Sequence, residues 1–295
     1  MRIGLIGCVK SSKMALETLL GIENIHVCAV ITRQSSRLNS DFFDLSPICK
    51  LHNIPYHFEV PSGQDNSILF FQQFNLDLIY CIGWSHLLSE KMLNLSKLGV
   101  IGFHPTKLPR NRGRHPIIWS LALGLEETAS TFFKMDAEAD SGPILSQVNV
   151  PINHSDDAQD LYNRILDVAK EQLVRLTLQL TTGSVEYVMQ NQMQASYWRK
   201  RSRIDGVIDF RMSANAIYNL VRALAPPYPC AELIFKGKYI PVVSASIAEE
   251  IFPVDIEPGF VLESLDSRIL VKTSDSGAIW LNGIFENSIR AGDYL

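Results

Sequence analysis

The chain has 295 residues, of which 46% are hydrophobic and 20% are charged, and its formal net charge is −4 at pH 7. A chain of this length and composition can bury a core in two domains, which excludes disordered, collagenous and coiled-coil proteins. Nucleic-acid binders usually carry a basic excess, so the acidic balance argues against a nucleic-acid partner. No apolar run approaches the ~18 residues of a membrane span and no signal peptide is evident, so we expect a cytoplasmic protein without a membrane partner.

The first hundred residues alternate short apolar runs with amphipathic stretches. The runs 2–6, 26–31, 78–82 and 99–103 predict strands of a parallel sheet, because such strands are buried on both faces. Alternating strands and helices imply right-handed crossovers and an α/β, Rossmann-like fold. In such a sheet, ligands bind beyond the carboxyl ends of the strands. Three segments reach that edge and are candidates for the site: 7–13, 83–88 and 104–113.

The second half of the chain changes character near residue 200. Residues 155–180 show helical periodicity, with Ser155 as the expected N-cap. The basic stretch 197–210 predicts a linker, a helix follows near 215–224, and short β-rich runs begin near residue 229. We therefore expect a catalytic domain over residues 1–200 and a small, β-rich, OB-like domain over residues 201–295.

The five cysteines are spread along the chain without a C-x-x-C pair. An odd number of cysteines without paired spacing fits neither a disulfide framework nor a zinc site. We expect reduced thiols that serve as small core residues at Cys8, Cys28, Cys49, Cys81 and Cys230.

The densest polar segment is 102–118, which follows a predicted strand. It holds four cationic side chains and two imidazoles, His104 and His115, among three prolines. This composition favours an anion-handling loop with a titratable histidine at its root, although a solvated surface loop is the alternative. For Arg112 and Arg114, a structural salt bridge is equally compatible with the sequence.

Two further segments have both a functional and a structural interpretation. Asp136, Glu138 and Asp140 could form a metal cluster, but the spacing is not that of an EF-hand loop. We favour a turn that presents Asp140 to a histidine, where a carboxylate holds the tautomer and stabilises the cation. The loop 7–12 opens a helix and suits a phosphate, but an ordinary strand–helix turn fits it as well.

The run GFHPTKLPRNRGRHPIIWSLALGLEETASTFFKMDAEADSGPIL, residues 102–145, resembles the signature region of the N10-formyltetrahydrofolate-dependent formyltransferases. The family pattern H-P-S-L-L-P-x-x-R-G, followed by D-x-G-x-D-x-G-x-I, corresponds to 104–113 and 136–144. The run YWRKRSRIDGVIDFRMSANAIYNLVRALAPPYPCAELIF, residues 197–235, resembles the segment that joins the two domains of these enzymes. The resemblance covers most of the chain.

Within this superfamily, the loops SDFFDLS (40–46) and GWSHLL (83–88) resemble the nucleotide-sugar branch. That branch implies transfer of a formyl group from N10-formyltetrahydrofolate to a nucleotide-linked 4-amino-4,6-dideoxy sugar, such as a UDP-linked sugar of a pseudaminic-acid-type pathway for surface glycans. It also implies a homodimer. The alternatives are a methionyl-tRNA formyltransferase, a formyltetrahydrofolate hydrolase and a non-catalytic nucleotide-binding protein.

The resemblance also implies residue roles. His104 is the expected base and proton shuttle, and Asp140 is its expected partner. The family usually has an asparagine two residues before the histidine, which donates to the formyl oxygen, but this chain has Gly102. We hypothesise that His115 or a backbone amide replaces that donor.

The expected binding residues form two groups. The folate site comprises Gly83, Trp84, Ser85, His86, Leu88, Ala139, Asp140 and Gly142, although Trp84 could equally be a core residue. The nucleotide-sugar site comprises Lys10, Ser11, Ser12, Asp41, Phe42, Thr106, Lys107, Arg110 and Asn111.

Overall fold

The computed structural model describes residues 1–35, 40–60, 63–226, 228–283 and 289–295. Pro227, which is part of the run that resembles the domain-joining segment, lies outside the described residues. The chain divides into two compact units. The first unit comprises Met1–Pro116, Thr128–Val150 and Asn163–Trp198, and the second comprises Ile117–Glu127, Pro151–Tyr162 and Arg199–Leu295. The functional boundary expected near residue 200 stays a prediction.

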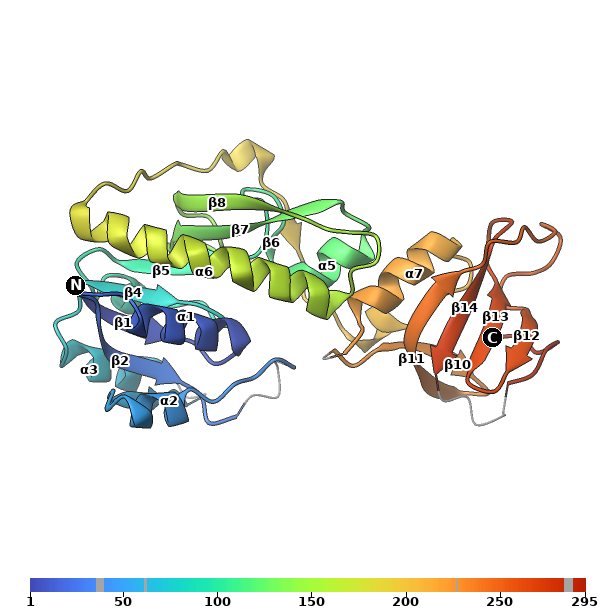
Figure 1. Ribbon diagram of the computed structural model, residues 1–295, viewed down its shortest axis with the longest axis horizontal. Coiled ribbons are helices and arrows are strands. Elements are labelled where there is room, and N and C mark those ends of the chain that lie inside the picture. The colour runs from blue at the N-terminus through green and yellow to red at the C-terminus, as the bar shows by residue number, and fades with distance from the viewer. Residues whose placement is uncertain (36–39, 61–62, 227, 284–288) are drawn as a thin grey trace. The chain divides into compact units, whose positions relative to one another are not determined.

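A seven-stranded sheet forms the centre of the first unit, with the strand order β3-β2-β1-β4-β5-β7-β8 (Figure 1). The first five strands in this order are parallel, and β7 is antiparallel to β5. The Rossmann-like parallel core is therefore confirmed, while β3 and the antiparallel extension were not predicted. The strands are β1 (Arg2–Ile6), β2 (His26–Thr32), β3 (Tyr56–Phe58), β4 (Leu78–Cys81), β5 (Val100–His104), β7 (Glu127–Lys134) and β8 (Ile144–Pro151).

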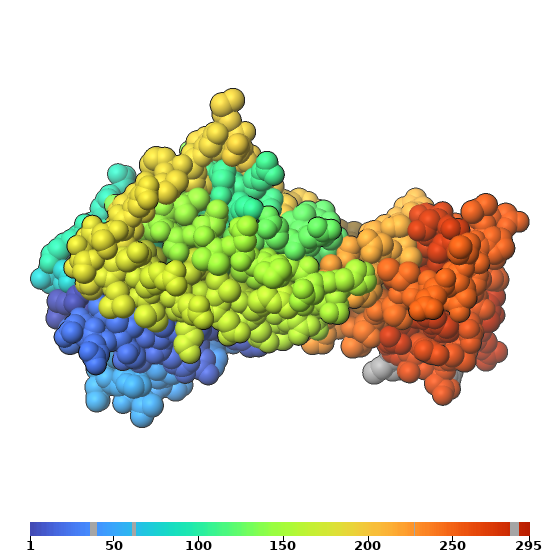
Figure 2. Space-filling view, turned by 45° about the horizontal axis from the view of Figure 1, so that its top comes forward, coloured from blue at the N-terminus to red at the C-terminus, as the bar shows by residue number. Residues whose placement is uncertain are grey.

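Helices cover both faces of this sheet. Leu78 and Tyr80 point into one core cluster with residues of α1 and α6, whereas Ile79 and Cys81 point into the other with residues of α3 and α4. This alternation is the period of two that a β-strand imposes. Figure 2 shows the first unit from a side on which α6, in yellow-green, covers much of the surface. The helices are α1 (Lys10–Leu20), α2 (Ser46–Leu51), α3 (Asp65–Gln72), α4 (Glu90–Leu93), α5 (Pro116–Ala122) and α6 (Ala158–Thr182).

The expected N-cap of α6 was wrong. The carboxylate of Asp157, not Ser155, accepts the backbone N–H groups of Gln159 (2.8 Å) and Asp160 (3.0 Å). A carboxylate at this position satisfies two free amides and lies at the positive end of the helix dipole.

After α6, the chain returns along the sheet and pairs with the loop that follows β5. Val188 forms an isolated bridge with Ile144, the first residue of β8. The short strands β6 (Arg112–Gly113) and β9 (Tyr197–Trp198) then pair in parallel, after the 3₁₀ helix η1 (Gln192–Gln194). Segment 188–198 is thus attached to both the central sheet and the 110–114 loop.

The second unit contains a five-stranded antiparallel sheet in the order β10-β11-β14-β13-β12, which confirms the expected β-rich domain (Figure 1). Helix α7 (Ala214–Ala223) packs against β11 and β14, and Ser213 caps it by accepting the Ala216 N–H (3.2 Å). The remaining elements are η2 (Arg203–Gly206), β10 (Ala231–Phe235), β11 (Lys238–Ile247), β12 (Val261–Leu265), β13 (Arg268–Lys272) and β14 (Ala278–Gly283).

The described residues contain neither a membrane-spanning helix nor a metal-binding cluster. No helix in the described ranges has both the length and the hydropathy that crossing a bilayer requires. Likewise, among the side chains that the structure describes, no three or more His, Cys, Asp or Glu residues gather in an arrangement that could hold a metal ion.

Candidate active site

The last residue of β5, His104, lies at the carboxyl edge of the sheet and is only 5% exposed. Its Nε2 atom lies 2.9 Å from the backbone oxygen of Asn111. A carbonyl oxygen only accepts hydrogen bonds, so this contact requires Nε2 to carry its hydrogen. In the neutral ring, the lone pair is then on Nδ1, which faces Asp140 Oδ2 at 3.6 Å. The geometry leaves Nδ1 as the nitrogen that can take up a proton, beside a carboxylate that stabilises the cation.

Asp140 is held in place by the loop that carries Asn111. The Gly113 N–H donates to the same carboxylate oxygen that faces His104, at 2.9 Å. Asp140 has a φ of 56°, in the left-handed region that few residues other than glycine adopt. Such a backbone persists only where the surrounding contacts determine it. The predicted pairing of His104 with Asp140 is therefore present in the geometry, with the 110–114 loop as its support.

Arg112 and Arg114 hold this loop through oxygen atoms that carry no charge. Arg112 is fully buried, and its guanidinium donates to Gln190 Oε1 (2.7 Å from Nη2) and Gln192 Oε1 (2.9 Å). Arg114 donates to the backbone oxygen of Ser85 at 2.6 Å. Two adjacent residues of the 110–114 loop therefore contact two other segments: Gly113 contacts the turn that carries Asp140, and Arg114 contacts the 83–88 loop. Neither arginine makes a salt bridge in these contacts.

Gly83 is required where the 83–88 loop meets the first helix. Its φ is 70°, and a Cβ atom there would lie 2.2 Å from Val9 Cγ2 and 2.7 Å from Ser12 Oγ. Ser12 donates to the backbone oxygen of Ile82 at 2.6 Å and is fully buried. The hydroxyl group that was predicted to face a pyrophosphate instead joins two loops. Ser11 is also nearly buried and has its Oγ 2.8 Å from the same Cβ position.

The structure brings together three residues of the predicted nucleotide-sugar site. Val9 forms an isolated bridge with Phe42, and the Lys10 N–H donates to the backbone oxygen of Asp41 at 3.1 Å. The side chain of Lys10 is exposed at this junction. Segment 40–46 therefore lies against the start of α1, as a shared binding surface requires.

The other predicted nucleotide-sugar residues lie on the loop after β5. Lys107 and Arg110 are exposed, as cations that meet an anionic ligand must be. Thr106 is fully buried, and its hydroxyl donates to the backbone oxygen of Arg110 at 3.2 Å. Thr106 thus shapes the loop from inside and offers no surface to a ligand in this conformation.

Trp84 and His86 lie in a cationic environment that the sequence did not predict. The Arg33 guanidinium lies 4.6 Å from the centre of the Trp84 ring. Burial, together with the charges of Arg33 and Arg114, lowers the pKa of His86, which keeps this imidazole neutral near pH 7. Leu88, by contrast, is 7% exposed and packs in the core between the sheet and α4.

The turn after β7 presents Asp140 as predicted. Asp136 accepts the hydroxyl of Ser141 (2.5 Å) and the N–H of Glu138 (3.1 Å), so it closes the turn. At Gly142, a Cβ atom would lie 1.8 Å from the backbone oxygen of Lys134, so only glycine fits. Ala139 lies half-buried in the same turn.

Gly102 leaves no vacant space for the asparagine that the family usually carries. A Cβ atom there would lie 2.9 Å from both Met135 Cγ and Phe133 Cζ. Phe133 lies in β7, where it pairs with Gly102, and Met135 is the first residue after β7. A side chain at position 102 would therefore require Phe133 and Met135 to shift. Because glycine has no side-chain donor, a donor to an oxyanion must come from elsewhere.

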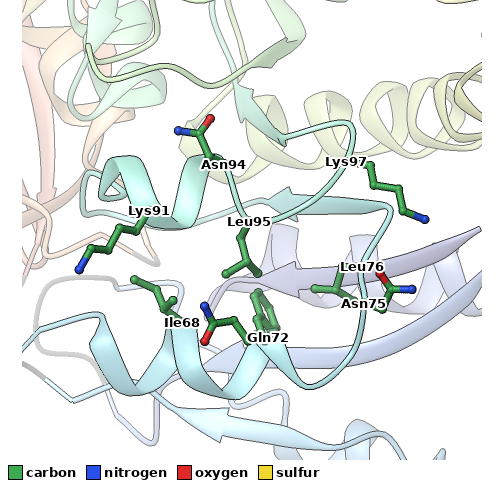
Figure 3. A pocket seen from close by; sticks show the side chains of 9 residues that line it. Ile68, Gln72, Asn75, Leu76, Lys91, Asn94, Leu95 and Lys97 are labelled. Carbon is green, nitrogen blue, oxygen red and sulfur yellow. The ribbon is translucent and has the colours of Figure 1, made fainter.

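Two surface hollows lie beside α3 and α4, away from His104. One, of about 500 Å³, is lined by Ile68, Phe71, Gln72, Asn75, Leu76, Lys91, Asn94, Leu95 and Lys97 (Figure 3). The other, of about 690 Å³, includes Leu87 and Leu88, where the 83–88 loop meets α4.

Comparison with known families identifies the class of protein. A model of the formyl transferase family matches residues 24–177, and a model of the formyl transferase C-terminal domain matches residues 200–291. The first match alone covers just over half of the chain. The chain therefore belongs to the formyltransferase family, and it is an enzyme of that class.

Solved structures share the fold of the whole chain. The sugar 3N-formyltransferase WlaRD, determined with dTDP and 5-N-formyl-THF, has a TM-score of 0.73 and 18% identity over 98% of this chain and 99% of its own. An N-formyltransferase from Helicobacter canadensis, in complex with folinic acid and dTDP-3-aminofucose, has a TM-score of 0.73 and 18% identity over 95% and 98%. HypX from Aquifex aeolicus, in complex with tetrahydrofolic acid, matches 95% of this chain and 43% of its own, with a TM-score of 0.65 and 18% identity.

Proposed function

We propose that the protein transfers a formyl group from N10-formyltetrahydrofolate to the amino group of a nucleotide-linked amino sugar. The observation that carries the proposal is the His104–Asp140 pair at the carboxyl edge of the sheet, with Nδ1 facing the carboxylate at 3.6 Å. Family membership and the folate and dTDP-sugar ligands of the structural relatives support it. A binding protein without activity would have no use for a proton-accepting nitrogen held in this way.

The residues present suit a folate. The 83–88 loop and the 136–142 turn each carry a glycine whose protein neighbours leave no room for a side chain, so the backbone course of both segments is fixed. Gly113 and Arg114 connect these two segments around His104. Gly83, Trp84, Ser85, His86, Ala139, Asp140 and Gly142 would hold the donor, which supplies the formyl group when bound.

His104 accepts and returns the protons that move during the transfer. An attacking amine must lose a proton and the departing nitrogen must gain one. Nδ1 accepts the first proton, Asp140 stabilises the imidazolium, and the same nitrogen returns a proton, while the Asn111 oxygen keeps Nε2 protonated throughout. We assign the oxyanion to His115 or a backbone amide, because Gly102 has no side chain that could donate a hydrogen bond.

The finer substrate assignment is also part of the proposal. We propose that the acceptor is a 4-amino-4,6-dideoxy sugar, such as a UDP-linked substrate of a pseudaminic-acid-type pathway. In this proposal the nucleotide lies over Lys10, Ser11, Asp41 and Phe42, and the loop cations Lys107 and Arg110 lie near the diphosphate. Lys10 and Asp41 meet in the structure, and Lys107 and Arg110 are exposed, which supports this placement. A homodimer in the cytoplasm is the assembly and location that we propose.

The test is a direct assay. The purified chain is mixed with 10-formyltetrahydrofolate and a panel of UDP-, dTDP- and GDP-linked amino sugars, and each product is examined by mass spectrometry for one added formyl group. A formylated sugar that is absent with His104→Asn supports the proposal. Release of formate without any sugar product would instead indicate a hydrolase, and no reaction with any combination would contradict the proposal.

A further inference from the structure

A buried glutamine outside the recognised motifs connects the two segments on which the site depends. Gln190 is 7% exposed and lies between the Val188 bridge and η1. Its amide oxygen accepts from Arg112 Nε (3.2 Å) and Nη2 (2.7 Å). Its amide nitrogen donates to the backbone oxygens of Asp140 (2.9 Å) and Gly142 (2.7 Å). Both hydrogens and both lone pairs of the amide are therefore in use.

Together with the contacts of His104, these bonds form a closed ring of residues around His104 Nδ1, the nitrogen expected to accept the proton. His104 contacts Asn111 through Nε2 and Asp140 through Nδ1. Asn111 precedes Arg112 in the chain, and Arg112 reaches Asp140 through Gln190. Gln190 is the only member of this ring that contacts the backbone of Asp140 by a side chain, among the contacts of the described residues. It therefore restrains the residue whose left-handed backbone needs restraint.

Only an amide side chain of this length can make both sets of bonds. A glutamate at position 190 would keep its attraction to Arg112 but would turn a carboxylate oxygen toward two carbonyl oxygens, which repel it. An apolar side chain would leave the buried carbonyl oxygens and the buried guanidinium without these partners, and unpaired buried groups are costly. The identity of the side chain matters here in addition to its volume.

We propose that Gln190 is a positioning residue, which holds Asp140 against His104 and thereby sets the rate of turnover and not the affinity for the sugar nucleotide. The proposal rests on the formyl transfer proposed above. Gln190 contacts neither His104 nor any residue expected to bind the sugar nucleotide, but it contacts Asp140 and Gly142 of the expected folate site. Its effect on turnover passes through Asp140.

The experiment compares Gln190→Glu with Gln192→Glu. Gln192 is a matched control: its amide oxygen also accepts from Arg112 (2.9 Å), but its side chain is exposed, and among the described residues Arg112 is its hydrogen-bond partner. We expect Gln190→Glu to lower kcat by ~10²-fold, as displacements of about 1 Å do, with the KM for the sugar nucleotide changed less than about threefold. Gln192→Glu should stay within about twofold of the wild type in both parameters.

A double-mutant cycle tests whether the effect passes through Asp140. In an Asp140→Asn background, Gln190→Glu should lower kcat by less than about threefold, because residues that act as one unit are not additive. A full loss in that background would overturn the proposal, and so would an equal loss with Gln192→Glu. If Gln190→Glu does not fold, Gln190→Asn serves instead: it keeps the amide but is one methylene too short to span both partners, and wild-type kcat in Gln190→Asn would equally overturn the proposal.

A measurement without turnover separates this proposal from the proposed function. With ¹⁵N-histidine labelling, the imidazole resonance of His104, assigned by its absence in His104→Asn, should move in Gln190→Glu and stay in place in Gln192→Glu. An unmoved resonance overturns the role of Gln190 even if the enzyme formylates a sugar. A moved resonance in a chain that formylates no sugar contradicts only the proposed function.

Discussion

The candidate site of the first unit and the surface of the second unit use arginine in different ways. In the first unit, Arg112 and Arg114 donate to a glutamine oxygen and a backbone oxygen beside the candidate site. In the second unit, the exposed arginines Arg203 and Arg211 pair with the carboxylates of Glu232 (2.7 Å) and Asp209 (2.6 Å), while the buried Arg222 donates to neutral oxygens as Arg112 does. A buried arginine bound to neutral oxygens fixes a loop, since its loss leaves buried groups unpaired. Exposed ion pairs contribute little to stability. Changes at Arg112 and Arg114 should therefore affect turnover, and changes at Arg203 and Arg211 should affect only the response of the second unit to acid.

The largest effect should come from His104. Replacing His104 with Asn removes the nitrogen that faces Asp140, and general acid–base catalysis of this kind contributes ~10²–10⁴-fold. We expect kcat to fall by ~10³-fold, and the melting temperature must be compared as well, because His104 is buried and donates to the Asn111 oxygen. Steady-state kinetics with the substrate found in the panel measures this. His52→Asn, at an exposed histidine after α2, is the control, and equal activities of the two variants would remove His104 from the scheme.

His115 should come next. If it donates to the oxyanion in place of the family asparagine, His115→Ala should lower kcat by ~10²-fold. The dissociation constant of the nucleotide, measured by calorimetry, should change little, because the expected nucleotide contacts lie elsewhere. Since His115 has a φ of 56°, the melting temperature must be compared as well. Turnover near the wild-type rate would leave a backbone amide as the donor.

Gly102 should affect stability before activity. Gly102→Asn restores the residue that the family usually has, but it places a side chain where Phe133 and Met135 already pack. Overpacking of this kind costs ~1–3 kcal/mol, so urea unfolding should show a lower free energy of unfolding and no gain in kcat. Gly102→Ala, with one added carbon, should show a smaller loss. A Gly102→Asn variant that is as stable as the wild type and more active would mean that Phe133 and Met135 can make room for the side chain.

The smallest effect should be the acid response of the second unit. Hydrogen bonds from Arg203 and Arg211 lower the pKa of Glu232 and bring that of Asp209 to about 2, below the values of the unfolded chain. These two ion pairs therefore stabilise the folded state when the pH is above the ordinary carboxyl pKa. This stabilisation is lost as the pH falls through the lowered pKa values of the two carboxyl groups. Burial raises the pKa of Glu59 in the first unit, so that protonation favours its folded state.

Hydrogen exchange at acid pH measures this difference by segment. Between about pH 4 and pH 2, peptides around Asp209 and Glu232 should lose protection before those around β3, and Arg203→Gln should remove part of the pH dependence near Glu232. Earlier loss of protection around β3 would reverse the comparison between the two units.

Much of the candidate site followed from local pattern. His104, Asp140, Gly83 and Gly142 stand at strand ends or in tight turns, and both features are visible in neighbouring residues. Arg33 and Gln190 could not be found in this way, because each acts through a partner that lies at least 50 positions away, Trp84 for Arg33 and Asp140 for Gln190. The sequence around Gln190 has no periodicity or charge pattern that marks it.

The sequence alone determined the elements and the chemistry that local residues can carry. Apolar runs predicted the parallel strands, and helical periodicity predicted α6. The segments at the carboxyl edge of the sheet predicted where a ligand binds. Only the tertiary structure decided which nitrogen of His104 is free, that Phe133 and Met135 fill the space beside Gly102, and that Gln190 holds Asp140. The reason is physical: hydrophobic periodicity is written in residues a few positions apart, whereas packing and the pairing of buried polar groups depend on partners that only the folded chain brings together.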